Sequence, residues 1–255
     1  MKRIDLNCDM GEMPGMLADG SQAALMRFIT SANVACGGHA GNAEMMRATI
    51  DQAQTAGVAI GAHPGYEDRA NFGRIELNLS HGEIAASVHR QIVALDEIAQ
   101  SCGARVAHVK PHGALYNQAA RDAGIARAIA DGVVRWRNDV VLVGLAGSAM
   151  IEEFRDAGFH VAAEAFADRR YERDGSLRSR KYADALLGGS EEAAAQALRI
   201  VRHGVVLALS GEEVAIDAQT ICIHGDTTGA VQIAEAVDKA LRGAGITLEG
   251  LAIVV

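Results

Sequence analysis

The 255-residue sequence lacks the segments that carry proteins into or across a membrane. No uninterrupted apolar run approaches the roughly 18 residues that a membrane-spanning helix needs. The first residues, MKRIDLNCD, bring in charge before the apolar part of a signal peptide could form. We therefore expect no membrane partner, no secretory signal and a cytoplasmic location.

Cysteine is scarce as well, with four residues in the whole chain. No two of them form a Cys-x-x-Cys pair or stand at the spacing of a zinc finger, which argues against a metal-finger module. We interpret them as reduced thiols that pack as small hydrophobic side chains. Hydrophobic residues make up 49% of the chain, which at this length is typical of a globular protein with a sizeable core.

Basic residues are fewer than acidic ones, 24 against 32, and the known phosphate-binding loop motifs are missing. The formal net charge is −8, whereas a nucleic-acid-binding face is normally basic, so we expect no nucleic-acid partner. No Gly-x-Gly-x-x-Gly follows the first predicted strand, and no Gly-x-x-x-x-Gly-Lys-[Ser/Thr] loop occurs. Any nucleotide must therefore be bound by other means.

The chain does contain a regular alternation of short β-branched runs with Ala-rich helical patterns. This alternation predicts βα repetition in a single domain over residues 1–255. Residues 203–220 predict an inserted β-hairpin that turns near Gly211. The seven repeating strands are predicted at 3–9, 31–37, 58–64, 105–112, 140–146, 160–168 and 221–226.

Capping residues mark three of the helices. Ser80 with Glu83 forms a capping box before one apolar helical face, and Gly103 is its stop signal. Two further helices are expected at 43–56, opened by Asn42 and ended by Gly57, and at 191–203, opened by Ser190.

An alternation of strands and helices leaves two main architectures, an open doubly wound sheet and a closed barrel. Polar residues gather at the ends of at least five strands rather than at one switch point, which favours the mouth of a barrel. An antiparallel sheet with one solvated face is the alternative. The helix-length connections favour parallel strands over that alternative.

Alternation within the strands predicts a polar interior. Successive side chains of a strand point to opposite sides, so His108, Lys110 and His112 share one face. A buried ion without a partner costs several kcal/mol, so a polar lumen needs a functional reason. The same alternation places Asp5, Asn7 and Asp9 on one face of their strand. It also pairs Glu164 with Asp168 and His224 with Asp226.

Five of the nine histidines fall within or just after predicted strands. Histidine is suited to proton transfer near neutral pH and to binding divalent metals. Taken singly, each is more often a core residue, but together with the acidic residues at the same rim they predict a catalytic pocket. Arg169 follows a strand end, where it could bind a carboxylate or a phosphate. The five are His39, His63, His108, His112 and His224.

Six multi-residue motifs run in order along essentially the whole chain. They are DLNCDMGE (5–12), SANVACGGHAGN (31–42), GAHPGYEDRANFGR (61–74), HVKPHGALYN (108–117), EAFADRRY (164–171) and ICIHGD (221–226). Together they resemble the LamB/YcsF family, which contains the A subunit of the prokaryotic 5-oxoprolinase. Two places depart from the family pattern, since Ile75 replaces a second arginine and Met13-Pro14-Gly15 stands where Gly-Phe-Gly is common.

The resemblance implies a TIM-barrel-like (β/α)7 barrel of the glycoside hydrolase/deacetylase-like superfamily. It also implies a role in the ATP-dependent hydrolysis of 5-oxo-L-proline to L-glutamate, together with partner subunits B and C and with Mg as the companion of ATP. Two alternatives stay open. One is a metal-dependent amidohydrolase or deacetylase that acts without ATP, and the other is a non-catalytic subunit that binds the lactam.

Our hypothesis for the site combines the residue pattern with the resemblance. Lys110 would contact the phosphate or amide oxygen, and His112 would transfer protons. A divalent metal on Asp9, His39 and His63 is suggested by the kinship with deacetylases. The other catalytic candidates are Asp9, Glu164 and His224, and the candidate substrate-binding residues are Asn7, Asn33, Asp168, Arg169 and Asp226.

Overall fold

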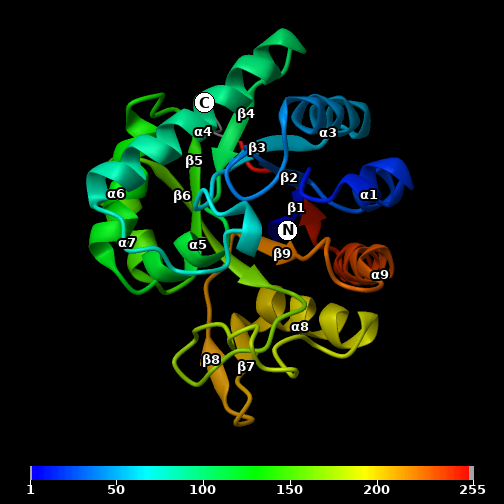
Figure 1. Ribbon diagram of the computed structural model, residues 1–255. Helices are drawn as coiled ribbons and strands as arrows, with labels where there is room; N and C mark the ends of the chain where they lie inside the picture. Colours follow the sequence, from blue (N-terminus) through cyan, green and yellow to red (C-terminus); the bar gives the residue numbers. More distant parts are fainter. Residues whose placement is uncertain (1, 253–255) are drawn as a thin grey trace.

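Seven parallel strands close into a barrel in the computed structural model, which describes residues 2–252 (Figure 1). The strands pair in chain order from β1 to β6, β9 pairs with β6, and β9 also pairs with β1 to close the ring. This confirms the predicted TIM-barrel-like fold and all seven predicted strands. The strands are β1 (Arg3–Met10), β2 (Ser31–Ala35), β3 (Ala59–His63), β4 (Val106–Val109), β5 (Val141–Leu145), β6 (His160–Phe166) and β9 (Thr220–Ile223).

Helices surround the barrel and cover the outer face of its strands (Figure 1). No helix within residues 2–252 is long and apolar enough to cross a membrane. The helices are α1 (Pro14–Ala18), α2 (Ser21–Leu25), α3 (Ala43–Ala56), the 3₁₀ turn η1 (Arg69–Asn71), α4 (His81–Ser101), α5 (Gly113–Ala119), α6 (Ala123–Val134), α7 (Ala149–Asp156), α8 (Ser190–His203) and α9 (Ala230–Gly243).

Two of the three predicted helix starts have the expected caps. The Asn42 side chain accepts a hydrogen bond from the Met45 amide at the start of α3. Ser80 and Glu83 form a reciprocal capping box at the start of α4. The prediction for Ser190 was wrong in detail, because Gly189 occupies the cap position and Ser190 is the first residue of α8.

The alternation along β1 separates two environments. Ile4, Leu6 and Cys8 belong to the large apolar core between barrel and helices. Asp5, Asn7 and Asp9 make their side-chain hydrogen bonds to residues of other strands, inside the barrel. A small separate apolar cluster, which contains Val141, Val143, Ala162 and Leu251, fills another part of the interior.

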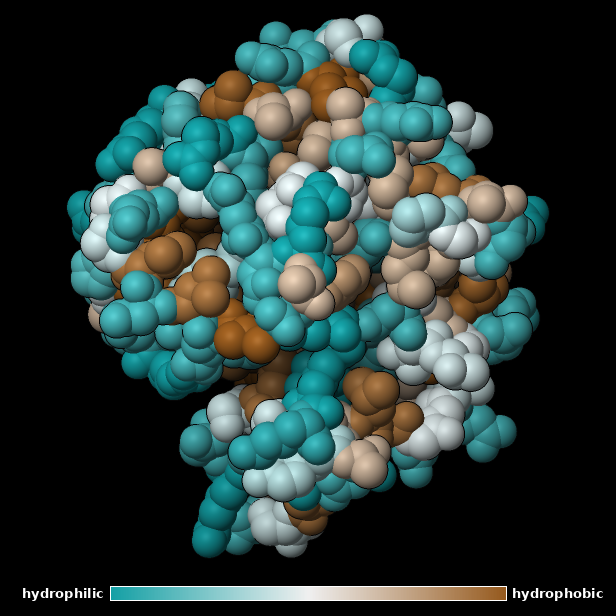
Figure 2. Space-filling model, viewed as in Figure 1, coloured by the Kyte–Doolittle hydropathy of each residue, from teal (hydrophilic) through white to brown (hydrophobic). Residues whose placement is uncertain are grey.

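A two-stranded antiparallel sheet lies outside the barrel, within the region 203–220. It consists of β7 (Val205–Leu207) and β8 (Glu213–Ala215), and Leu207 pairs with Glu213 across the turn. This sheet and the loops after β6 project from the rest of the surface in the ribbon and space-filling views (Figures 1 and 2). A short strand β10 (Thr247–Leu248) pairs with β1. The prediction of one domain covered residues 1–255, of which residue 1 and residues 253–255 lie outside the described residues.

Candidate active site

One cavity of 730 Å³ opens at the carboxyl ends of the strands, where the active sites of TIM barrels lie. Residues from both halves of the chain line it. Of the residues that the sequence predicted for a site, those on its wall are Asp9, His63, Lys110, His112, Arg169, His224 and Asp226.

Lys110 is the central cation of the cavity floor. Its Nζ lies 2.8 Å from a Glu164 oxygen, 3.1 Å from an Asp9 oxygen and 3.2 Å from the Asn7 amide oxygen. Burial alone would lower the pKa of the Lys110 ammonium, but the nearby negative groups, Asp9 first, hold that pKa well above its usual range. Lys110 is therefore a permanent positive charge at the base of the cavity.

Asp9 remains ionised beside this cation. Burial alone would raise the pKa of its carboxyl, but His63 and Lys110 outweigh burial and hold the pKa well below its usual range. The Asn33 amide also donates to Asp9 at 2.9 Å. Asp9 thus offers a fixed carboxylate oxygen to whatever occupies the cavity.

Three of the predicted residues lie behind the cavity wall and position its lining. Asn7 donates to Glu164 at 2.9 Å, and Asn33 donates to Asn7 at 2.8 Å. All three are at most 1% exposed and do not line the cavity. They hold Asp9 and Lys110 in place, so the structure separates Asn7 and Asn33 from the expected substrate contacts.

His108 lies one layer deeper than the pocket for which the alternation predicted it. Its Nε2 donates to the Asn33 oxygen at 2.8 Å, and its ring packs where a Cβ of Gly61 would stand. Burial lowers the pKa of His108 to about 3, so its ring is neutral. It is a structural residue of the barrel interior.

Asp168 and His224 form a pair at the other side of the mouth. His224 donates from its amide and from Nδ1 to the Asp168 carboxylate, both at 2.9 Å. Burial alone would raise the pKa of Asp168, but His224 outweighs burial and lowers it. The His224 ring stacks on Phe166 with a centroid distance of 5.4 Å, and its Nε2 has no partner within residues 2–252. This is the geometry of an oriented proton acceptor.

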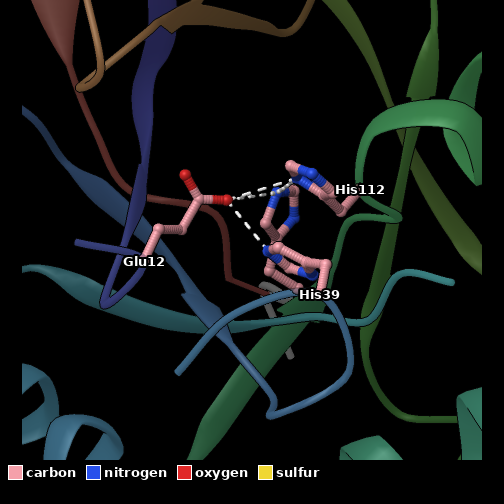
Figure 3. Close-up of side chains that lie close together, drawn as sticks. Glu12, His39 and His112 are labelled. Atoms are coloured by element: carbon pink, nitrogen blue, oxygen red, sulfur yellow. Dashed lines mark hydrogen bonds and ion pairs between the residues drawn. The ribbon is translucent and has the colours of Figure 1, made fainter. Parts of the chain in front are cut away.

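A cluster of three histidines and one glutamate follows the first four strands. Figure 3 shows the Glu12 carboxylate facing the rings of His39 and His112. Glu12 Oε1 lies 2.9 Å from His39 Nε2, 3.2 Å from His112 Nδ1 and 3.8 Å from His63 Nε2. Burial lowers the pKa of His39 to about 4. The His39 and His112 rings stack 3.6 Å apart.

This cluster differs from the predicted metal set of Asp9, His39 and His63. The four residues whose ligand atoms all lie within 4.8 Å of one another include Glu12 and His112, whereas Asp9 borders the cluster 3.3 Å from His63 Nε2. Sequence reasoning missed Glu12 because it follows the end of β1, past Gly11 at φ 71°, where strand alternation no longer applies. Its place in the DLNCDMGE motif was the available signal.

Arginines from distant loops form the outer rim. Arg74 and Arg180 both donate to Asp226, at 2.5 and 3.0 Å. The Asp226 carboxylate therefore positions these two arginines and is already paired within the protein. Arg169 lines the cavity, but its Nη2 donates to the Arg178 carbonyl at 2.5 Å. Arg74 and Arg180 were not among the predicted site residues, because both lie in loops well beyond the ends of β3 and β6.

The comparisons with known proteins agree on one family. The LamB/YcsF family model matches residues 4–254. The 5-oxoprolinase A subunit of Chloroflexus aggregans is 50% identical over 97% of this chain and 98% of its own, and that of Tolumonas auensis is 47% identical over 98% and 100%. The crystal structure of a lactam utilization protein of Thermus thermophilus is 43% identical, with a TM-score of 0.90 over 97% of this chain and 99% of that one.

More distant structures share the fold alone. A putative cellobiose-phosphate cleavage protein of Enterococcus faecalis, at 15% identity, has a TM-score of 0.58 over 98% of this chain and 97% of its own. A structure described as a T48 deacetylase with substrate, at 16% identity, reaches 0.50 over 98% and 88%. The family match and the close relatives span the whole fold, and the chain belongs to the LamB/YcsF family.

Proposed function

We propose that this chain is the A subunit of an ATP-dependent 5-oxoprolinase and that it opens the lactam ring of 5-oxo-L-proline to give L-glutamate. One observation carries the proposal. In a chain half identical to a protein named as a 5-oxoprolinase A subunit, a single cavity gathers a buried cation, a fixed carboxylate and an oriented histidine. These are the groups that the hydrolysis of an activated amide requires.

The charge of the cavity suits an anionic substrate. Six cationic side chains line it against five acidic ones, although the whole chain carries a formal net charge of −8. Both 5-oxoproline and ATP are anions, and such local positive charge attracts them. Our candidates for the substrate carboxylate are Arg169, which follows the end of β6, and Arg180, which forms an ion pair with the cavity-lining Asp226. The six are Arg74, Lys110, Arg121, Arg169, Arg180 and Lys181.

The chemistry follows from the stability of a five-membered lactam. Transfer of the γ-phosphoryl group of ATP to the amide oxygen makes the ring carbon electrophilic. A first water then adds to that carbon, and the ring C–N bond breaks as the nitrogen takes up a proton. A second water hydrolyses the resulting acyl phosphate to L-glutamate and phosphate. Lys110 stabilises negative charge on the oxygen, Asp9 orients the water, and His224 accepts its proton through Nε2 while Asp168 holds the ring.

His112 has a different role in this proposal from the one that the sequence suggested. Its Nε2 donates to the Phe72 carbonyl at 2.9 Å, and its Nδ1 faces His63 and Glu12. Both ring nitrogens are thus engaged within the protein. Proton transfer therefore passes to His224, the cavity-lining histidine whose second nitrogen faces no described residue.

The proposal is tested by combining the chain with its presumed partner subunits B and C and measuring glutamate and phosphate release. Each component is omitted in turn. His224→Asn should lower the rate about 10²–10⁴-fold and Lys110→Met about 10²–10³-fold. His203→Asn is the matched control, because His203 is exposed at the end of α8, and it should keep the wild-type rate.

The outcomes separate the competing functions. Glutamate release without ATP would replace our proposal with an amidohydrolase that acts without ATP. Wild-type turnover by folded His224→Asn and Lys110→Met variants would leave only the role of a lactam carrier. Turnover by a mixture that lacks this chain would overturn its catalytic role altogether.

A further inference from the structure

We infer that Glu12, His39, His63 and His112 form a binding site for one divalent transition-metal ion of the zinc type. The inference goes beyond the proposed function, because it concerns a resident ion rather than the lactam or ATP. The four residues lie at or just after the ends of four consecutive strands, β1 to β4, and reach one point at the mouth of the barrel. Figure 3 shows the Glu12 carboxylate and two of the imidazole rings directed toward that point.

Hydrogen bonds at the outer nitrogens determine the tautomers of two rings. His63 Nδ1 lies 2.7 Å from the Lys110 carbonyl, and His112 Nε2 lies 2.9 Å from the Phe72 carbonyl. A carbonyl oxygen only accepts, so both of these nitrogens carry their proton. In a neutral ring the other nitrogen is then an acceptor. When both rings are neutral, as they must be to bind a metal ion, His63 Nε2 and His112 Nδ1 therefore both present lone pairs.

These two lone pairs face each other at 3.0 Å. The next neighbours are also acceptors, since Glu12 Oε1 lies 3.2 Å from His112 Nδ1 and an Asp9 oxygen lies 3.3 Å from His63 Nε2. Without a bound cation these buried acceptors need a proton between them, because a buried acceptor that has lost water and gained no partner is unfavourable. A cation at the shared point resolves the conflict for all of them.

The spacing of the ligand atoms fits a single small ion. Nitrogen and oxygen ligands about 2.0–2.1 Å from a tetrahedral zinc ion lie about 3.3 Å from one another. The observed separations are 2.9, 3.2 and 3.8 Å from Glu12 Oε1 to the three ring nitrogens and 3.0 Å between His63 and His112. All four ligand atoms lie within 4.8 Å of one another, so the side chains need only draw closer together for binding.

The ligand type selects the metal. Imidazole nitrogens suit Zn²⁺, Co²⁺, Ni²⁺ and Fe²⁺, whereas Mg²⁺ and Ca²⁺ prefer sites made of oxygens. The bonds from His63 and His112 to backbone carbonyls are also the outer contacts that metal-binding histidines usually make. His39 differs, because its Nδ1 has no partner within residues 2–252. We expect His39 to be the weakest of the four ligands.

The ion would face the cavity, since Glu12, His63 and His112 line its wall. A metal there supplies a Lewis acid next to Asp9 and Lys110. Its presence is nevertheless measurable without turnover. Failure of the metal site is thus distinguishable from failure of the proposed function.

The test is metal binding by the purified chain after treatment with a chelator. Calorimetric titration with Zn²⁺ should show one ion per chain, and Co²⁺ should give the intense visible absorption of tetrahedral coordination. Glu12→Gln, His63→Ala and His112→Ala should each weaken Zn²⁺ binding by at least about 100-fold, and His39→Ala by about 10-fold. His203→Ala is the matched histidine control and should bind like wild type.

Circular dichroism and thermal melting establish that each variant is folded. The inference is overturned if the wild-type chain binds no more Zn²⁺ than a folded His63→Ala/His112→Ala double variant. A strongly deshielded proton signal in the NMR spectrum of the metal-free chain, unchanged by Zn²⁺, would instead place a shared proton between the two rings and also overturn it.

Discussion

Asp5 illustrates how a single buried carboxyl links this fold to pH. It accepts hydrogen bonds from the hydroxyl groups of Thr30 at 2.7 Å, Ser31 at 2.6 Å and Thr220 at 2.5 Å. Burial raises the pKa of Asp5 to about 6, and the three hydroxyl donors offset only part of that effect. The folded protein therefore holds this proton more tightly than the unfolded chain does.

A carboxyl with a raised pKa stabilises the fold at low pH and loses that contribution as pH rises. Between about pH 4 and pH 6 the unfolding free energy of wild type should fall by roughly 3 kcal/mol relative to Asp5→Asn, and the difference should then stay constant. Urea denaturation at several pH values measures it. The exposed Asp51→Asn is the control, and a difference between wild type and Asp5→Asn that is independent of pH would contradict the prediction.

At the scale of single residues, the sequence predicts which residues line the cavity better than it predicts what each of them does. Asp9, Lys110 and His224 line the cavity as expected, because each lies on or just after a barrel strand whose alternation can be read directly. His108 obeys the same alternation but lies too deep, since depth along a strand depends on register with its neighbours. Glu12 lies beyond the strand, where no period applies.

The contribution of one capping box to the stability of the protein can be measured at the start of helix α4. Ser80→Ala removes the hydroxyl that accepts from the Glu83 amide at 3.3 Å and should cost about 1 kcal/mol of unfolding free energy. Ser190→Ala provides the matched comparison, because Ser190 makes no capping bond in α8, and it should change stability by less than about 0.5 kcal/mol. Equal losses in chemical denaturation would refute the role of the box.

Strand boundaries were the less predictable part of the elements. The predicted strand 105–112 ends at Val109, because Pro111 has no amide proton for the ladder. The extended path nevertheless continues, with the amides of Lys110 and His112 donating to Ala62 and Pro64. Alternation thus predicted the direction of these side chains correctly, although the register shift at Ile60/Gly61 is not evident from sequence.

The sequence pattern favoured a barrel over an open sheet, and the family resemblance implied its (β/α)7 form. Polar strand ends, helix-length connections and capped helices all indicate parallel strands with a common mouth. What the sequence could not supply is which loops meet there, since Arg74 and Arg180 join at Asp226 only through closure of the ring.

A bound metal should stabilise the molecule as a whole, because its four ligands follow four different strands. At a Zn²⁺ concentration 100 times the dissociation constant, the unfolding free energy should rise by about 2.7 kcal/mol. Glu12→Gln should lose most of this gain, and Mg²⁺ at the same concentration should produce none. A melting temperature that Zn²⁺ leaves unchanged would count against linkage between the ion and the fold.

The pairing of β9 with β1 also bears on synthesis at the ribosome. His224 follows the last strand of the ring, so a growing polypeptide has the residues of the histidine cluster long before it has either the closing strand or His224. Under the proposed function, chains that end before β9 should therefore be inactive even when the partner subunits are present.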